Sequence, residues 1–201
     1  SLALWREYKW GLFITTIPAV YHNVAAFSLG LIVEPIQLGL LFGASKIHRA
    51  MNTLYGPLGQ AIYPRLISTN SKNSNQTKRL LRKLFYIMLG MGFVFTGILL
   101  GFTERIIIIL LGEQYLDARP ILQLFALILP LTAITHVMGR QWMLIKAQDK
   151  HYGIILGVAS IMGTFFVWLG INTYNLSVLP LSMILFESVV IGLILTRNLF
   201  K

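Results

Sequence analysis

The stretch LFYIMLGMGFVFTGILLGFT, residues 84–103, runs for 20 positions without a charged side chain. The hydrocarbon core of a bilayer is about 30 Å thick, and a helix needs roughly 20 apolar residues to cross it. The stretch therefore predicts a membrane-spanning helix, and the fold class depends on how many similar stretches the rest of the chain contains.

The composition of the whole chain agrees with this interpretation. Of the 201 residues, 56% are hydrophobic and only 12% are charged, and the mean hydropathy is +0.70. A soluble domain has about 25% charged residues, so a globule of this size could not cover its own surface. The composition excludes a disordered tail, a collagen-like repeat and an ordinary soluble enzyme. Cysteine is absent, which excludes disulfide bonds and thiolate sites.

Windows of low charge elsewhere in the chain predict five more spans. The six expected spans cover about residues 10–33, 36–64, 84–103, 120–139, 153–171 and 177–196. The uncharged run 151–186 is too long for one helix, and the polar residues 172–175 divide it. The second span is taken as one helix although Lys46 and Arg49 lie inside it. Residues 105–112 are too short to span and are expected to form a tail of the third helix or an interfacial segment. We therefore expect an all-α, polytopic membrane protein.

The basic residues are unevenly distributed between the expected loops. The formal net charge is +10, from 17 Lys and Arg against 7 Asp and Glu, and residues 65–83 hold the largest cluster of Lys and Arg. The number of Lys and Arg residues alternates between high and low from loop to loop, as the positive-inside rule requires. Both ends of the chain are therefore expected in the cytoplasm. The basic surplus reflects orientation and contact with anionic lipids, and no nucleic acid partner is expected.

A polar stripe on the second span is the main candidate for a binding site. At about 100° per residue, Lys46, Arg49, Thr53 and Gln60 fall within an arc of about 80°. A Lys or Arg at the centre of a span costs roughly 2.5–3.5 kcal/mol, so both cations are expected to face a water-filled cavity. There they would bind a negatively charged group such as a diphosphate. In the alternative interpretation, the helix begins later and both side chains extend to the membrane interface.

Five other polar residues within or at the ends of the spans extend the candidate site. Glu187 is either a carboxylate that couples protons or cations, an ion partner of Lys46 or Arg49, or a protonated group that only packs helices. His22, Asn23 and His136 line the cavity or form hydrogen bonds between helices. Arg140 lies at the mouth of the cavity or anchors a helix end at the interface.

Glycines and prolines within the spans predict close helix contacts and kinks. Glycines four residues apart allow helices to approach closely, and prolines bend helices and leave carbonyls unpaired. The pairs are Gly39/Gly43, Gly97/Gly101 and Gly153/Gly157, and the prolines are Pro18, Pro57, Pro130 and Pro180. The kinks suit either a protein that changes shape or a static bundle. No catalytic motif and no Cys/His metal set occurs, so we expect no enzyme activity, cofactor or metal.

Several segments resemble the second half of Wzx-type polysaccharide flippases, of the multidrug/oligosaccharidyl-lipid/polysaccharide exporter superfamily. Members tend to show Lys-Ile-x-Arg-Ala and then Pro-x-x-Gln-Ala-x-x-Pro-Arg before a basic segment. Here the matching residues are 27–33 (FSLGLIV), 44–50 (ASKIHRA) and 55–65 (YGPLGQAIYPR). Residues 111–115 (LGEQY) and 122–126 (LQLFA) are similar to the segment after the third helix of that half.

The resemblance implies that the chain is the C-terminal, six-helix lobe of a twelve-helix, two-lobe flippase, consistent with a first residue that is not methionine. Such proteins move undecaprenyl-diphosphate-linked oligosaccharides across the bacterial inner membrane, for O-antigen, lipopolysaccharide or other surface polysaccharides, without ATP. By match, Lys46 and Arg49 line a cationic central cavity, with Gln60 and Arg65 on the same helix or just beyond it. The implied partners are the lipid-linked oligosaccharide, membrane lipids, the N-terminal lobe of the same protein and the polysaccharide polymerase.

Three other classes remain as alternatives. A drug or cation antiporter of the same superfamily would use acidic cavity residues, whereas the spans offer only Glu187 against Lys46 and Arg49. A membrane-bound enzyme of polysaccharide assembly would need a large outer loop with catalytic residues, and every predicted outer loop is short. A purely structural subunit would have no use for paired cations within the membrane.

Overall fold

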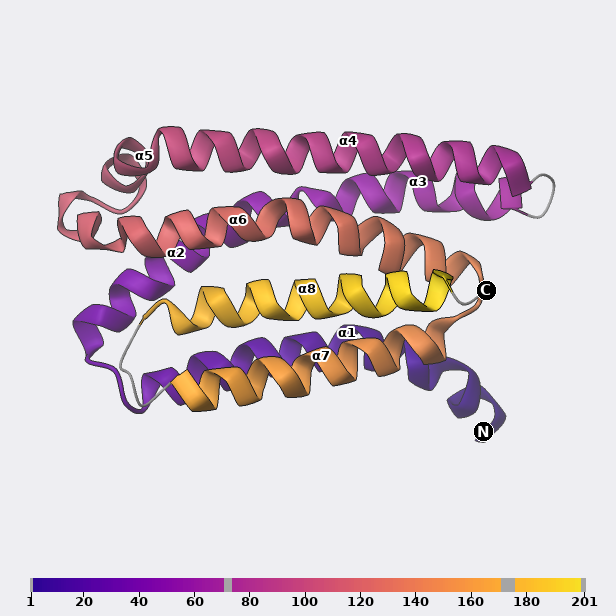
Figure 1. Ribbon diagram of the computed structural model, residues 1–201, viewed down its shortest axis with the longest axis horizontal. Coiled ribbons are helices and arrows are strands. Elements are labelled where there is room, and N and C mark those ends of the chain that lie inside the picture. The colour runs from indigo at the N-terminus through magenta and orange to yellow at the C-terminus, as the bar shows by residue number, and fades with distance from the viewer. Residues whose placement is uncertain (1, 71–73, 171–175, 200–201) are drawn as a thin grey trace.

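The computed structural model describes residues 2–70, 74–170 and 176–199 of the chain, and this part is helical, with no strand. The helices lie roughly along one axis and form an elongated bundle (Figure 1). The expected all-α class is confirmed. The elements are α1 (Leu2–Gly30), α2 (Pro35–Thr53), α3 (Tyr55–Asn70), α4 (Ser74–Gly101), α5 (Thr103–Leu110), the 3₁₀-helix η1 (Glu113–Ala118), α6 (Arg119–Thr135), the π-helix η2 (His136–Met143), α7 (Asp149–Gly170) and α8 (Val178–Leu199).

Five helical segments have the length and hydropathy to cross a membrane. They are Lys9–Gly30, Ser74–Gly101, Glu113–Met143, Asp149–Gly170 and Val178–Arg197. The chain is therefore a multi-pass membrane protein. Residues 172–175, expected to divide the last two spans, lie outside the described residues. The expected second span is not among the five segments.

Residues 36–64 do not form the single helix that we expected. Helix α2 ends at Thr53 and α3 begins at Tyr55, and the N–H of Leu54 between them donates to the carbonyl of Met51, only three residues back (3.2 Å). Pro57 explains the break, because it has no N–H to donate to the carbonyl of Thr53 and its ring would clash with that carbonyl. Pro57 itself lies in the first turn of α3, where a missing donor is tolerated. The expected polar stripe is therefore divided between two helices.

The basic segment 65–83 is not a long loop. Helix α3 continues to Asn70 and α4 begins at Ser74, so most of the basic side chains lie on helical turns. Helix α4 has 28 residues and is roughly 42 Å long at 1.5 Å per residue, which exceeds the hydrocarbon thickness of about 30 Å. The α3–α4 hairpin projects at one end of the bundle, where α1 also begins and α8 ends (Figure 1).

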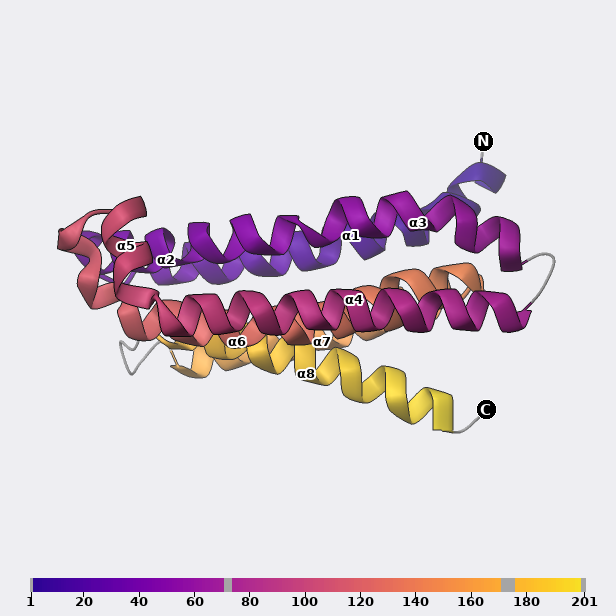
Figure 2. The same ribbon diagram turned by 90° about the horizontal axis from the view of Figure 1, so that it is seen from above.

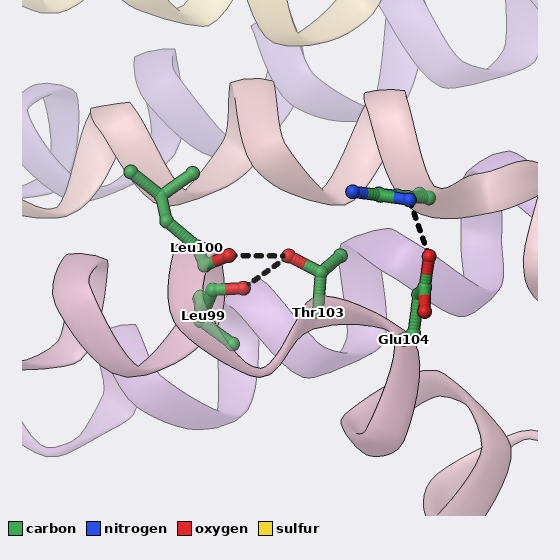
Figure 3. Close-up of polar contacts among 5 residues, drawn as sticks. Leu99, Leu100, Thr103 and Glu104 are labelled. Atoms are coloured by element: carbon green, nitrogen blue, oxygen red, sulfur yellow. Dashed lines mark hydrogen bonds and ion pairs between the residues drawn. The ribbon is translucent and has the colours of Figure 1, made fainter.

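The segment 105–112 is not a tail of α4, because its residues up to Leu110 belong to a separate short helix, α5. The chain turns sharply between α4 and α5 (Figures 1 and 2). The hydroxyl of Thr103 donates to the carbonyls of Leu99 and Leu100 (3.2 Å to the latter), and Glu104 forms an ion pair with Arg119, the first residue of α6 (Figure 3). The hydroxyl therefore satisfies carbonyls at the end of α4, and the ion pair joins α5 to α6.

Helix α6 lies at the centre of the bundle, between α2, α4 and α8. Pro130 within it cannot donate to the carbonyl of Ala126, four residues earlier. The hydroxyl of Thr96 on α4 donates to this carbonyl instead, at 2.7 Å. The hydroxyl of Tyr55 on α3 likewise donates to the carbonyl of Leu129, at 3.1 Å. Side chains of α3 and α4 thus satisfy the backbone of α6 near its proline, where water is excluded.

Candidate functional site

A cavity of about 1020 Å³, with a mostly apolar lining that includes several polar side chains, lies between α1, α2, α6 and α8. Helices α1, α2 and α3 form one layer, which lies over the layer of α4, α6, α7 and α8 (Figure 2), and the cavity lies between α1 and α2 against the second layer. Its polar lining consists of His22 and Asn23 from α1, and of Ser45, His48, Arg49 and Asn52 from α2. Phe125, Leu179 and Met183 complete its apolar wall on α6 and α8.

Arg49 provides the positive charge of this cavity. One guanidinium nitrogen, Nη2, donates to the hydroxyl of Ser45, one turn earlier on α2, at 2.8 Å. Ser45 is buried, with 6% of its surface exposed, so this hydrogen bond fixes the position of the guanidinium group. No carboxylate lies within ion-pair distance of Arg49 in the described part of the chain. Arg49 is therefore available to bind an anion that enters the cavity.

Two histidines and two amides surround the charge. His48 is 1% exposed, and its ring stacks on that of Phe125, with 5.3 Å between the ring centroids. The side-chain amide of Asn23 donates to the carbonyl of Ala19, at 2.8 Å. The cavity therefore combines a cation with groups that form hydrogen bonds to phosphate or to hydroxyl groups.

The structure brings together only some of the residues that the sequence predicted. Arg49, His22 and Asn23 lie around the cavity. Lys46 and Arg49 are both exposed on α2, but Lys46 is not among the residues that line the cavity. Thr53 is also exposed, and its hydroxyl donates to the carbonyl of Arg49, at 2.7 Å.

Gln60, His136 and Arg140 line a second, separate pocket of about 300 Å³ between α3 and η2. Tyr63 and Gln141 complete its polar lining, and Gly56 and Gly59 leave space on the α3 side. The expected single stripe thus serves two pockets, because α2 and α3 are separate helices.

Three residues that line the cavity lie outside the predicted stripe. Ser45 lies four positions before Arg49 and His48 one position before it. Asn52 lies three positions after it. A stripe centred on Arg49 would have included Ser45 and Asn52, because residues three and four apart share a helix face. The predicted stripe is instead centred between Lys46 and Arg49 and extends towards Gln60.

Glu187 joins two helices and does not pair with Lys46 or Arg49. The hydroxyl of Thr132 on α6 donates to its Oε1, at 3.0 Å. Its Oε2 is buried and has no hydrogen-bond partner among the described residues. Glu187 lines neither of the two pockets. Its contacts are those of a group that packs α8 against α6.

We expect Glu187→Gln to keep the stability of the bundle, because glutamine keeps an acceptor for Thr132 and removes only the ability to ionise. Glu187→Leu removes the acceptor and is expected to lower the free energy of unfolding by about 1–2 kcal/mol, the cost of a lost buried hydrogen bond. Thermal unfolding in detergent measures both variants. An equal loss of stability in Glu187→Gln would contradict this packing role and would show that the ionisable carboxyl group itself is needed.

Comparison with known proteins finds a similarity to a curated protein. The "Putative O-antigen transporter" of Escherichia coli (strain K12) is 28% identical to this chain over 154 residues, which cover 77% of this chain and 37% of that protein. The chain thus corresponds to well under half the length of this relative. No protein-family model and no solved structure matches the chain. The similarity supports a Wzx-like flippase family, as the sequence motifs indicated.

Proposed function

We propose that the chain is the C-terminal lobe of a flippase that moves undecaprenyl-diphosphate-linked oligosaccharides across the bacterial inner membrane, for O-antigen or another surface polysaccharide. In this proposal the lobe crosses the membrane six times, with α2 and α3 together as the second crossing, and both ends lie in the cytoplasm. The N-terminal lobe of the same protein closes the cavity from the other side. The similarity to an O-antigen transporter and the five apolar helices support the proposal.

The observation that carries the proposal is Arg49 in its cavity, without a carboxylate partner among the described residues. A guanidinium presents a planar set of donors that matches two phosphate oxygens at once. Flipping requires no bond to break, so these residues act by binding a diphosphate and by releasing it on the other side.

Two irregular helical segments lie beside the proposed binding site. The α2–α3 break at Leu54 follows Arg49 by five residues, and the π-helix η2 extends α6 beyond the cavity. Breaks and π-helical turns are places where a helix bends. We propose that they allow α2 and α6 to tilt as the cavity opens alternately to the two sides of the membrane.

The charge of the cavity argues against the main alternative. A drug or cation antiporter would need carboxylates in its cavity, and no Asp or Glu is found among the described residues that line this cavity.

The proposal is tested by deleting the gene in a bacterium that carries it and by following the lipid-linked repeat unit. We expect the unit to accumulate in the cytoplasmic leaflet, where it is labelled by a lectin in inverted membrane vesicles but not in spheroplasts. The full-length gene should restore labelling in spheroplasts. Normal surface polysaccharide in the deletion strain, without accumulation of the lipid-linked unit, would contradict the proposal.

A further inference from the structure

The π-helical segment η2 brings three polar side chains to one pocket. His136, Arg140 and Gln141 all line the second pocket, although the first and last are five residues apart. On an α-helix, residues five apart point about 140° away from each other. The i→i+5 hydrogen bonding of a π-helix brings such residues close to one face. π-Helical turns are rare and occur frequently at functional sites, so this pocket is a candidate site.

Gln141 presents an unpartnered acceptor at this pocket. Its side chain is 6% exposed, and its Oε1 has no hydrogen-bond partner within the described ranges. Gly59 on α3 makes room for it, since a Cβ at residue 59 would lie 2.7 Å from Nε2 of Gln141. A buried carboxamide oxygen without a donor costs free energy, so the pocket is incomplete without a ligand or a water molecule.

The chemistry of the lining distinguishes between two kinds of ligand. The unpartnered oxygen of Gln141 needs a donor, and the oxygens of an ionised phosphate only accept hydrogen bonds. A sugar hydroxyl both donates and accepts. The other polar side chains of the pocket are Gln60, Tyr63, His136 and Arg140. All four supply donors, and all except Arg140 also accept. A mixed set of donors and acceptors without Asp or Glu in the described lining matches a neutral sugar ring.

The two pockets follow one another along the bundle. Arg49 and Gln60 are eleven residues apart on α2–α3, which corresponds to roughly 16 Å at 1.5 Å per residue. Phe125 and His136, on the opposite wall, are separated by the same number of residues. A ligand with phosphates at one end and sugars extending from it could therefore contact both pockets at once.

We propose that the pocket between α3 and the π-helix η2 is a saccharide subsite, in which Gln141, Gln60 and Tyr63 bind hydroxyl groups of the sugar while Arg49 holds the phosphates. This inference rests on the proposed function. It divides recognition of the substrate between two pockets of the same lobe. In this proposal Arg140 contributes donors to the sugar.

The experiment compares two probes on the full-length protein in nanodiscs. One probe is undecaprenyl diphosphate, and the other is the sugar-bearing undecaprenyl-diphosphate repeat unit extracted from the deletion strain. Tyr63→Phe removes one hydroxyl group, and Gln141→Leu removes the amide while keeping the size of the side chain. We expect each variant to bind the sugar-bearing probe about three- to tenfold more weakly, the effect of one lost hydrogen bond, and to bind undecaprenyl diphosphate normally.

Arg49→Gln serves as the matched variant at the other pocket and should weaken the binding of both probes. Equal weakening of both probes in Tyr63→Phe, or no change for either, would overturn the subsite. If Gln141→Leu fails to fold, Tyr63→Phe and Gln60→Ala decide the question. Failure of the proposed function looks different, because the wild-type protein would then bind neither probe.

Discussion

Arg49→Gln in the full-length protein should nearly abolish surface polysaccharide, whereas Lys46→Gln should leave most of it. Arg49 lines the cavity and is held there by Ser45, so in the proposed function its replacement removes a charge-assisted hydrogen bond to the diphosphate. Such a bond contributes about 1.5–3 kcal/mol, which corresponds to a loss of roughly 10- to 100-fold in affinity. Lys46 lies outside the cavity lining, and its loss changes the binding of the diphosphate far less.

Polysaccharide on the cell surface, measured by gel electrophoresis and immunoblotting, reports the effect, and the amount of each variant in the membrane is the control. The two residues lie within one turn of the same helix, so the pair separates the role of the cavity from a general need for positive charge on α2. Normal polysaccharide in Arg49→Gln would remove the proposed phosphate site. Equal losses in both variants would show that the sequence motif, and not the cavity, identifies the functional cations.

Gly92→Val should prevent stable folding of the bundle, whereas Gly90→Val should not. A Cβ at residue 92 would lie 2.9 Å from both the Cα of Pro130 and the hydroxyl of Tyr55. A backbone atom cannot move aside as a flexible side chain can, so α4 would separate from α6. Overpacking of this kind costs typically 1–3 kcal/mol, and separation of the helices would add the loss of the hydrogen bond from Thr96 to Ala126.

Gly90 provides a close control because it lies two residues away on the same helix, with no atom within 4 Å of its Cβ position. Size-exclusion profiles and thermal unfolding in detergent measure both variants. Matching unfolding temperatures for the two variants would show that α4 and α6 can separate at Gly92 without loss of stability.

Hydropathy predicted most of the helices because the thickness of the bilayer sets their length. Hydropathy could not locate the helix ends. Helix α4, for example, begins ten residues before the apolar window that starts at Leu84. The basic residues there suggested a loop, yet Lys and Arg are good helix formers. The second span was misjudged for a different reason: Pro57 was recognised as a source of kinks, but the spacing alone did not show that α2 would end at Thr53.

The close helix contacts were also hard to predict. The spacing of four residues predicted close contacts correctly at Gly43 and Gly153, where a Cβ would lie 3.0 Å from Leu111 and 3.1 Å from Trp10. It also pointed to Gly97 and Gly101, which have nothing within 4 Å of their Cβ positions. Gly92, in contrast, lies against the backbone of α6. The pattern in the sequence reports where close approach is allowed, and it contains no information on which face of α4 meets another helix.

Only part of the candidate site could be predicted, again because local spacing does not show how helices pack. Helical periodicity placed Arg49 on a polar face, and the histidine and amide on α1 followed from their position within a span. The contact between Thr132 and Glu187, 55 residues apart, depends on how α6 and α8 pack, and local spacing cannot reveal it. The π-helix has no signature in the residues 136–143 that we recognised, so the second pocket was not separated from the first.

Pro130 also constrains the biogenesis of the protein. On its own in lipid, α6 would carry the carbonyl of Ala126 without a donor, and the hydroxyl that satisfies it belongs to Thr96 on α4. The ribosome synthesises α4 first, so the donor is already in the bilayer when the translocon releases α6. Co-translational insertion from the N-terminal side thus supplies the partner before the need for it arises, and a circular permutant with the reverse order would expose that carbonyl during insertion.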